Sequence, residues 1–234
     1  MTLVAAACFA AGAAAADLSS PIGSGSEPAP PWRLIGLPRQ TKPMTRFTVV
    51  ELDRQRVLRV EADHAFGNLL HPLRRAHAGT LTWRWRVDEL PAGADLQRRS
   101  GDDAPLKVCA LFDLPAEQVP FVDRQLLRIA SARAGEPLPT ATLCYVWDRS
   151  LPDGALLHNA YTHRVRYIIV RGTPGRWSDE RHDLAADFRR AFGDDSDNAS
   201  DVPGLTGVGI GADSDNTASH SIGYVSDLHL SERP

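Results

Sequence analysis

The segment of residues 80–88 carries the clearest pattern of side chains that could bind a ligand. It reads TLTWRWRVD, and successive side chains of a strand point to opposite faces. Trp83 and Trp85 therefore share one face, which we expect to be buried because two indoles contribute several kcal/mol of apolar burial. Arg84 and Arg86 share the opposite face, and the forked guanidinium group of arginine suits carboxylates and sulfates.

Lys107, in the run LKVCALFDL, would add a third cation to this face if its strand pairs with residues 80–88. Together with Arg84 and Arg86 it predicts a site for an acidic polysaccharide or another anionic ligand. A second interpretation stays open, in which this is a solvated sheet face whose charges are balanced by nearby carboxylates. Those carboxylates belong to Asp88, Asp102, Asp103 and Asp113.

An aromatic row in residues 142–148 (TLCYVWD) is a second candidate for ligand binding. In a strand, Leu143, Tyr145 and Trp147 lie on one face. An exposed apolar row of this kind indicates a binding surface, on which sugar rings could stack, whereas a row that contains a leucine also fits the core. We take Tyr145 and Trp147 as candidate ligand-binding residues beside the arginines.

The loop of residues 211–217 (GADSDNT) offers oxygen ligands for a metal. Asp213, Asp215 and Asn216 suit a hard cation, so calcium is the cofactor that the sequence suggests. The loop is not an EF-hand, because the twelfth position counted from Asp213 is Tyr224 rather than glutamate. Turn formation, in which such side chains bond nearby backbone N–H groups, is the alternative.

Signatures of catalysis are missing from the sequence. There is no G-x-S-x-G, H-E-x-x-H, Walker or G-x-G-x-x-G motif and no C-x-x-C pair. The 8 histidines are scattered without metal-ligand spacing. The sequence therefore favours a non-catalytic function, with a glycosidase or a polysaccharide lyase as the alternative.

The elements that would position these residues are mostly strands. Short runs rich in β-branched and aromatic residues, bounded by Gly, Pro, Asp or Asn, are typical of strands. They cover residues 32–37, 46–52, 57–62, 69–73, 81–87, 106–114, 141–147, 165–171, 205–211 and 221–230. Helical spacing occurs in residues 117–133 and 183–192. The predicted fold is mainly β, a two-layer, jelly-roll-like β-sandwich with two short inserted helices.

The N-terminal region predicts export. Residues 1–16 are apolar, carry no charge and end in three alanines, which is typical of a signal peptide, although no basic residue precedes them. An Ala-rich disordered N-terminus of a cytoplasmic protein is the alternative. Residues 17–31 are rich in Ser, Gly and Pro and predict a flexible linker, and residues 32–234 predict a single β-sandwich domain.

Composition limits the partners and the state of the cysteines. The net charge of −3 gives no general attraction for nucleic acid, and no second apolar run is long enough to span a membrane. Once Cys8 leaves with the signal peptide, Cys109 and Cys144 remain in a compartment that permits disulfides. Both lie in apolar strand-like runs, where free buried thiols are common, so we expect two thiols rather than a bridge.

Several strings in combination resemble a known family. They are VLRVEADHAFGNLLHPL, LTWRWRVDELPAGADLQRRSGDDAPLKVCALFD, TLCYVWD, RYIIVRG and VGIGADSDNTASHSIGYVSDLHL. Together they resemble a bacterial family of secreted proteins that is catalogued only as a domain of unknown function, over residues 32–230. The resemblance implies an exported, mostly β protein and no activity, so no catalytic residue can be carried over. The closing segment is also loosely similar to the ends of carbohydrate-binding jelly rolls, which is a likeness of fold.

These observations predict a periplasmic or secreted bacterial protein that binds a carbohydrate or another anionic ligand of the cell envelope. An enzyme on a jelly-roll scaffold is the second hypothesis. A non-enzymatic structural or assembly factor of the envelope is the third.

Overall fold

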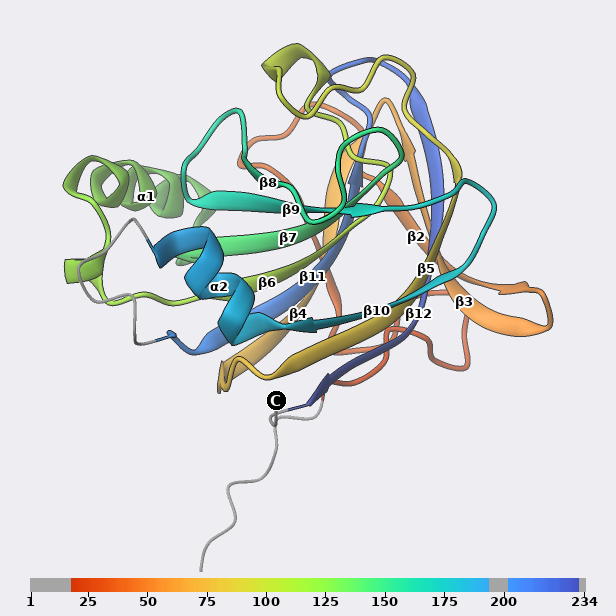
Figure 1. Ribbon diagram of the computed structural model, residues 1–234, viewed down its shortest axis with the longest axis horizontal. Coiled ribbons are helices and arrows are strands. Elements are labelled where there is room, and N and C mark those ends of the chain that lie inside the picture. The colour runs from red at the N-terminus through yellow and green to blue at the C-terminus, as the bar shows by residue number, and fades with distance from the viewer. Residues whose placement is uncertain (1–17, 194–201, 232–234) are drawn as a thin grey trace, which may run out of the picture.

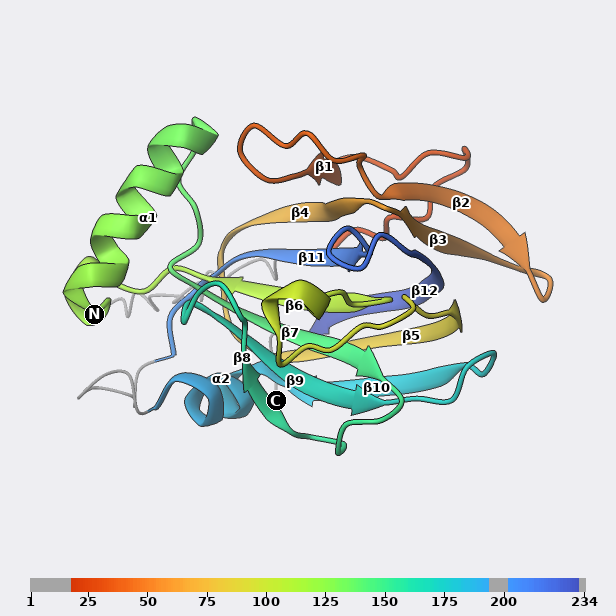
Figure 2. The ribbon, with the colours of Figure 1, turned by 90° about the horizontal axis from the view of Figure 1, so that it is seen from above.

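A computed structural model describes residues 18–193 and 202–231. Its strands form two sheets that pack face to face (Figures 1 and 2). The 7-stranded sheet has the order β1-β4-β11-β6-β7-β9-β8, and the 5-stranded sheet has the order β10-β5-β12-β3-β2. Neighbouring strands are antiparallel apart from β7 and β9, which are parallel. The predicted mainly β, two-layer sandwich is confirmed.

The strands of the larger sheet are β1 (Arg33–Ile35), β4 (Phe66–Ala76), β11 (Leu205–Asp213), β6 (Lys107–Phe112), β7 (Ala141–Asp148), β9 (Val165–Arg171) and β8 (Leu156–His158). Those of the smaller sheet are β10 (Ser178–Asp183), β5 (Thr80–Glu89), β12 (His220–Ser231), β3 (Gln55–Asp63) and β2 (Arg46–Leu52). The helices are α1 (Phe121–Ala134) and α2 (Leu184–Phe192), with short 3₁₀ turns at Arg99–Gly101 and Ala116–Gln118.

The core lies between the inner faces of the two sheets. Side chains of β5 alternate as expected for a half-buried strand, so that Trp83 and Trp85 are buried while Arg84 and Arg86 face outward. Tyr145 approaches from the other sheet, and its ring centroid is 5.2 Å from that of Trp83. The prediction that the tryptophan face of residues 80–88 belongs to the core is confirmed.

The two predicted helices are present, and they begin and end for identifiable reasons. α2 starts after Asp183, whose carboxylate accepts a hydrogen bond from the backbone N–H of Ala186 at 3.0 Å. α1 starts at Phe121, later than the sequence pattern indicated, because Pro120 directly precedes it. It ends at Gly135, which adopts the left-handed conformation that glycine tolerates.

Two strands escaped the sequence analysis. β10 reads SDERHD, so it lacks the apolar alternation by which strands are recognised. Its side chains nevertheless alternate between half-buried and exposed positions, because β10 pairs with β5 along the open edge of the smaller sheet. β8 has 3 residues, which is too short for a periodic pattern.

The segment predicted as a flexible linker lies against the sandwich over residues 18–31. Leu18 is buried, and the backbone N–H of Val49 on β2 donates to the carbonyl of Ser26 at 2.6 Å. The guanidinium of Arg56 donates to the carbonyls of Gly23 and Gly25. These bonds satisfy carbonyl groups of a Gly- and Ser-rich segment whose composition alone indicates flexibility. The predicted signal peptide, residues 1–16, lies outside the described residues.

Cys109 and Cys144 form a disulfide bond. They lie directly opposite each other on β6 and β7, with Cα atoms 4.0 Å apart. The expectation of two free thiols is therefore wrong, because strand register, which sequence spacing does not reveal, brings the two residues together. A bridge that closes a loop of 35 residues contributes roughly 4 kcal/mol to stability. Among the described residues, no helix is long and apolar enough to cross a membrane.

Candidate functional site

Arg84 and Arg86 lie on the outer face of the 5-stranded sheet, as the alternation of residues 80–88 predicts. The side chains of Arg84 and Arg86 keep 30% and 21% of their surface exposed. Arg84 Nε lies 2.9 Å from a carboxylate oxygen of Asp179 on β10. The arginines are therefore reachable from solvent, yet each already has a carboxylate partner.

Arg86 is held by two carboxylates. Its Nε donates to Asp88 Oδ1 at 2.6 Å, and its Nη1 lies 3.3 Å from Asp53 Oδ2. The hydrogen bond that Arg86 donates to Asp88 raises the pKa of Arg86, and the charge of Asp53 adds to the effect. The fork of Arg86 is thereby fixed in one orientation on the sheet.

Two aromatic side chains accompany the arginines on this face, and the sequence analysis missed both. Trp177 directly precedes β10, and Tyr224 on β12 lies opposite Arg86 in the strand register. The ring centroids of Trp177 and Tyr224 are 6.5 Å apart. The guanidinium carbon of Arg84 lies 5.3 Å from the Trp177 ring centroid, and Trp177 Nε1 donates to Asp53 at 3.3 Å. We call Arg84, Arg86, Trp177 and Tyr224 the outer-face cluster.

The charges on this face nearly cancel. Glu61 on β3 pairs with Arg59 at 2.7 Å and with Arg46 at 3.0 Å. The groups joined by ion pairs across the sheet are the arginines 46, 59, 84 and 86 and the carboxylates of Asp53, Glu61, Asp88, Asp179 and Asp227. The charges therefore agree with the second interpretation, a solvated sheet face on which carboxylates balance the arginines. Of the carboxylates that the sequence suggested for this role, only that of Asp88 forms one of these ion pairs.

Lys107 does not join the arginines. It lies on β6 in the other sheet, is 6% exposed and donates to Asp213 Oδ2 at 2.8 Å. The prediction that Lys107 shares a face with Arg84 and Arg86 required β5 and β6 to pair. They belong to different sheets, so the structure does not bring the three cations together.

Tyr145 and Trp147 form no sugar platform. Both are 0% exposed and pack in the core between the sheets. The Tyr145 hydroxyl donates to Asp187 on α2 at 2.8 Å. Burial and the nearby Asp187 charge raise the pKa of Tyr145, so the hydroxyl keeps its proton. Trp147 and Tyr145 therefore contribute to the packing of the sandwich rather than to a surface.

Two of the three residues suggested for calcium, Asp213 and Asn216, are engaged in hydrogen bonds, whereas the third, Asp215, stays a prediction. The two carboxylate oxygens of Asp213 accept hydrogen bonds from the Ala104 backbone N–H and from Lys107 Nζ. The ammonium group thus holds the position at which a metal would have to approach. Asn216 donates to the Asp102 carbonyl and accepts from the Tyr161 hydroxyl. Among the described residues, no group of at least three His, Cys, Asp or Glu side chains could hold a metal ion.

A comparison with protein-family models gives a match over residues 30–229 to the family described as "Protein of unknown function (DUF3047)". The chain belongs to this family. The resemblance of this DUF3047 chain to a family of unknown function, found from its sequence, is thereby confirmed. Its bacterial origin and its secretion remain predictions.

The solved structures that are similar to the DUF3047 chain include the N-terminal CBM22-1-CBM22-2 tandem domain of Xyn10C from Paenibacillus barcinonensis, with 13% sequence identity and a TM-score of 0.37. The match covers 93% of the DUF3047 chain and 50% of that chain. No curated protein matches the DUF3047 chain.

A polar network joins three loops, which contain Asp102 and Asp103, Asn159, and Asn216 and Thr217. Asp103 accepts hydrogen bonds from the backbone N–H groups of Asn216 and Thr217 and from the Thr217 hydroxyl. Asp102 accepts from the Asn159 amide at 2.7 Å. Burial raises the pKa of Asp102 to about 6, and the charge of Asp213 adds to this shift. The network explains Asp102 and Asp103 as groups that hold loops in place.

A histidine lies between two carboxylates where α2 meets β10. His182 Nδ1 is 3.5 Å from Asp187 and its Nε2 is 3.7 Å from Glu180. Burial lowers the pKa of His182, but the two nearby carboxylates of Asp187 and Glu180 outweigh it and the pKa is raised. Its ring also stacks on Trp83 with centroids 5.2 Å apart. The imidazole ring of His182 therefore links α2, the edge strand β10 and the core.

Proposed function

We propose that this DUF3047 protein binds a carbohydrate at the outer-face cluster. The observation that carries the proposal is that the outward arginines of β5 lie next to two aromatic side chains from the neighbouring segments of the same sheet. Trp177 and Tyr224 are both half-buried, with ring centroids 6.5 Å apart. Aromatic faces of this kind can stack on the C–H groups of a sugar ring.

The chemistry around the rings matches the hydroxyl groups of a sugar. Each hydroxyl can donate one hydrogen bond and accept two. Arg84 and Arg86 supply donors at fixed positions, and Asp53, Asp88 and Asp179 supply acceptors beside them. Because these groups are already oriented by their ion pairs, a ligand would not have to order long flexible side chains on binding.

The charge balance favours a neutral carbohydrate over an acidic one. A polyanion is attracted by uncompensated cations, whereas the arginines of this face are linked to carboxylates such as Asp53, Glu61 and Asp179. A carboxylate or sulfate would have to displace those partners or lie beside them, and like charges in contact oppose binding. We therefore expect neutral glycans to bind better than uronic-acid or sulfated ones.

The location we propose for this function is the periplasm or the outside of the cell. The disulfide between Cys109 and Cys144 supports it, because disulfides persist mainly in oxidising compartments. The apolar residues 1–16 remain the predicted export signal.

The proposal is tested by a glycan array that contains neutral, uronic-acid and sulfated glycans. We expect the protein to bind a neutral set, and Trp177→Ala to weaken binding about tenfold or more, as the loss of one ring stacked in a binding site does. Arg84→Ala with Arg86→Ala should weaken it further. Tyr161→Ala, which removes an exposed ring from a different loop, is the matched control.

Thermal melting of each variant checks that it is folded. Retention of full binding by folded Trp177→Ala and by the double arginine variant would refute the site. Absence of binding to every glycan class would refute the function.

A further inference from the structure

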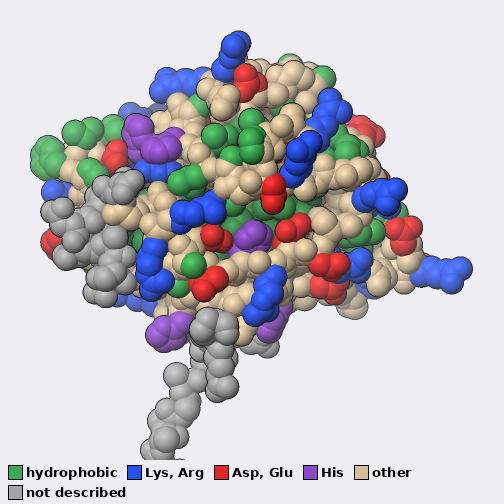
Figure 3. Space-filling model, in the orientation of Figure 1, with side chains coloured by type: hydrophobic (Ala, Val, Ile, Leu, Met, Phe, Trp, Pro, Cys, Tyr) green, Lys and Arg blue, Asp and Glu red, His purple; other side chains and the backbone are tan. Residues whose placement is uncertain are grey.

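Helix α1 is unlike the rest of the molecule in the side chains it exposes. None of its 14 residues is buried by the described part of the chain. Phe121, Val122, Leu126 and Ile129 are 67%, 68%, 59% and 51% exposed. Figure 3 shows hydrophobic side chains gathered at the end of the molecule where Figure 1 places α1. Large apolar side chains that cluster on a surface indicate an interaction site.

The spacing of these residues makes one continuous stripe. Val122, Leu126 and Ile129 stand at positions i, i+4 and i+7, which share a face of an α-helix. Phe121 adjoins the stripe at the first turn. The next residue along the stripe is Arg133, in the last turn of the helix.

The charge of α1 is positive. Its sequence, FVDRQLLRIASARA, contains three arginines, Arg124, Arg128 and Arg133, against the single acidic residue Asp123. The acidic residue that follows the helix, Glu136, is occupied by a two-bond ion pair with Arg33 on β1, at 2.7 and 3.3 Å. Two of the three arginines, Arg128 and Arg133, are exposed.

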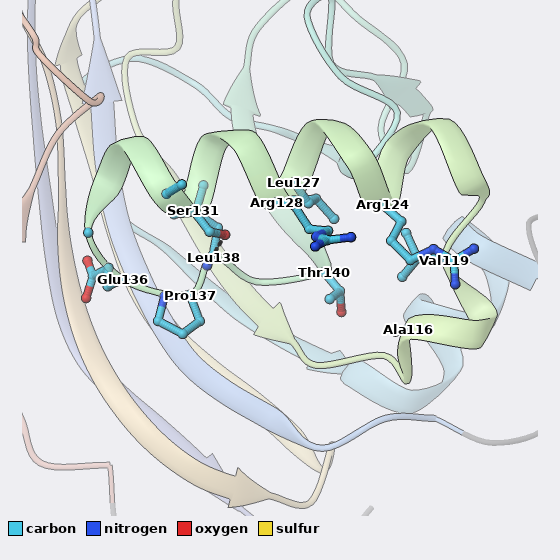
Figure 4. A pocket seen from close by; sticks show the side chains of 12 residues that line it. Ala116, Val119, Arg124, Leu127, Arg128, Ser131, Glu136, Pro137, Leu138 and Thr140 are labelled. Atoms are coloured by element: carbon cyan, nitrogen blue, oxygen red, sulfur yellow. Dashed lines mark hydrogen bonds between the residues drawn. The ribbon is translucent and has the colours of Figure 1, made fainter.

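An apolar groove of about 610 Å³ runs beneath α1. Val119, Leu127 and Leu138 contribute to its walls, and Arg124 and Arg128 extend from the helix over it (Figure 4). The guanidinium carbon of Arg124 also lies 5.7 Å from the Phe121 ring centroid. Helix α1 therefore has the exposed apolar stripe on its outer side and the apolar groove on its inner side, and its arginines lie beside these surfaces.

We propose that α1 docks the protein on an anionic phospholipid surface. The stripe of Val122, Leu126 and Ile129 would enter the boundary between headgroups and acyl chains, and Arg128 and Arg133 would contact phosphate groups. A membrane is broad and flat, so the docking element must protrude. Figure 2 shows α1 at one end of the molecule, to the side of the sheets. This inference is independent of carbohydrate binding on the outer face.

The charge of α1 favours a lipid surface over a second copy of the chain. A two-fold pairing of antiparallel α1 stripes would place Arg128, near the middle of the helix, beside Arg128 of the other copy, and like charges across an interface oppose association. An anionic surface attracts positively charged groups, and each arginine near the headgroups adds to the attraction.

The test is vesicle flotation of the full chain. One vesicle contains phosphatidylglycerol and phosphatidylcholine in equal parts, and the other contains phosphatidylcholine alone. We expect binding to the anionic vesicle that is stronger by about tenfold or more and that weakens as salt is added. Arg128→Glu with Arg133→Glu should remove this preference and its salt dependence.

Leu126→Glu with Ile129→Glu should lower binding to the anionic vesicle by about tenfold or more, since two apolar side chains no longer enter the lipid. Both residues are exposed, so the variant is expected to fold. Tyr161→Glu, at a ring that is 55% exposed on another loop, is the matched control and should bind as the unmodified chain does.

Three results would overturn the proposal. One is the absence of binding to either vesicle. Another is equal binding by the unmodified chain and the α1 variants, which would place the contact outside α1, for example in residues 1–17, which all variants share. The third is a dimer, seen by analytical ultracentrifugation, that Leu126→Glu with Ile129→Glu dissociates, since a second copy would then cover the stripe.

Discussion

The helices α1 and α2 have similar sequence patterns and opposite surroundings. In α2, Leu184, Phe188 and Phe192 repeat at helical spacing and all three are buried against the sandwich. In α1, Val122, Leu126 and Ile129 repeat with the same regularity and stay exposed. Periodicity therefore indicates that a segment is helical, but it does not indicate what covers the apolar face.

The two helices differ in burial because they differ in the contacts that hold them to the rest of the protein. α2 is capped by Asp183, bonded to Tyr145 through Asp187, and packed on Phe112. α1 has no side-chain cap, and its C-terminal end is tied to β1 by the exposed pair of Arg33 and Glu136. Substitutions in α2 should therefore change the stability of the protein, and those in α1 should change what it binds.

The largest expected effect is that of Phe188→Ala. The Phe188 ring lies 4.6 Å from Phe112 and 5.0 Å from Phe192, centroid to centroid. Its removal leaves a cavity between α2 and the larger sheet, which should cost about 3–5 kcal/mol of unfolding free energy. Urea unfolding measures it. A cost below about 1 kcal/mol would mean that α2, like α1, is not part of the core.

Asp187→Ala should have the next largest effect. It leaves the buried Tyr145 hydroxyl without its acceptor and removes one carboxylate from His182, at a cost of about 2 kcal/mol. Adding Tyr145→Phe to this variant removes the orphaned hydroxyl and should recover part of the loss. If the double variant is less stable than Asp187→Ala by the full cost of a second substitution, the two residues act independently.

Asp183→Ala tests the start of α2. The carboxylate accepts a hydrogen bond from the Ala186 N–H, and loss of such a cap costs about 1 kcal/mol. Asp183→Ser retains an acceptor and should restore most of the stability. Equal stabilities of the alanine and serine variants, measured by thermal melting, would show that the cap does not hold this helix.

The strand that carries the arginines shows how much of the fold the sequence contains. Alternation in residues 80–88 predicts both the buried face of Trp83 and Trp85 and the outward face of Arg84 and Arg86, because each side chain's direction depends only on its own strand. Asp183 likewise marks the start of α2 through local chemistry, because its carboxylate accepts a hydrogen bond from the first turn. Local rules were sufficient wherever the property was local.

Pairing between strands could not be predicted in the same way. Lys107 lies on a different sheet from the arginines, and the register that joins Cys109 to Cys144 is set by contacts between β6 and β7. Trp177 joins the candidate site only because β10, a strand of polar residues, pairs with β5. In the sequence, Trp177 stands alone after a turn that contains glycine. That position does not indicate that its ring lies beside Arg84.

The pH dependence of stability should distinguish α2 from α1. The pKa of His182 is raised in the folded state by Asp187 from α2 and Glu180 from β10, against the opposing effect of burial, while Tyr145 on β7 faces the same carboxylate. The stabilisation is therefore complete below the unfolded pKa of about 6.5 and is lost as the pH rises through the folded pKa. The effect should be smaller than that of the cap, since a neutral imidazole still stacks on Trp83.

This pH dependence is checked by measuring the unfolding free energies of the unmodified chain and of His182→Gln at several pH values around neutrality. The difference in unfolding free energy should be largest on the acid side and shrink as the pH increases. A difference that stays constant over this range would show that the charge of His182 does not contribute.

The smallest expected effect on stability is that of Leu126→Ala in α1. A side chain that is 59% exposed loses little burial when truncated, so the unfolding free energy should change by no more than about 0.5 kcal/mol. A ligand that binds only the folded chain raises its melting temperature. If α1 docks on lipid, anionic vesicles should raise the melting temperature of the unmodified chain more than that of Leu126→Ala. A loss of several kcal/mol without vesicles would show instead that Leu126 is covered within the chain itself, and the contrast between the two helices would then disappear.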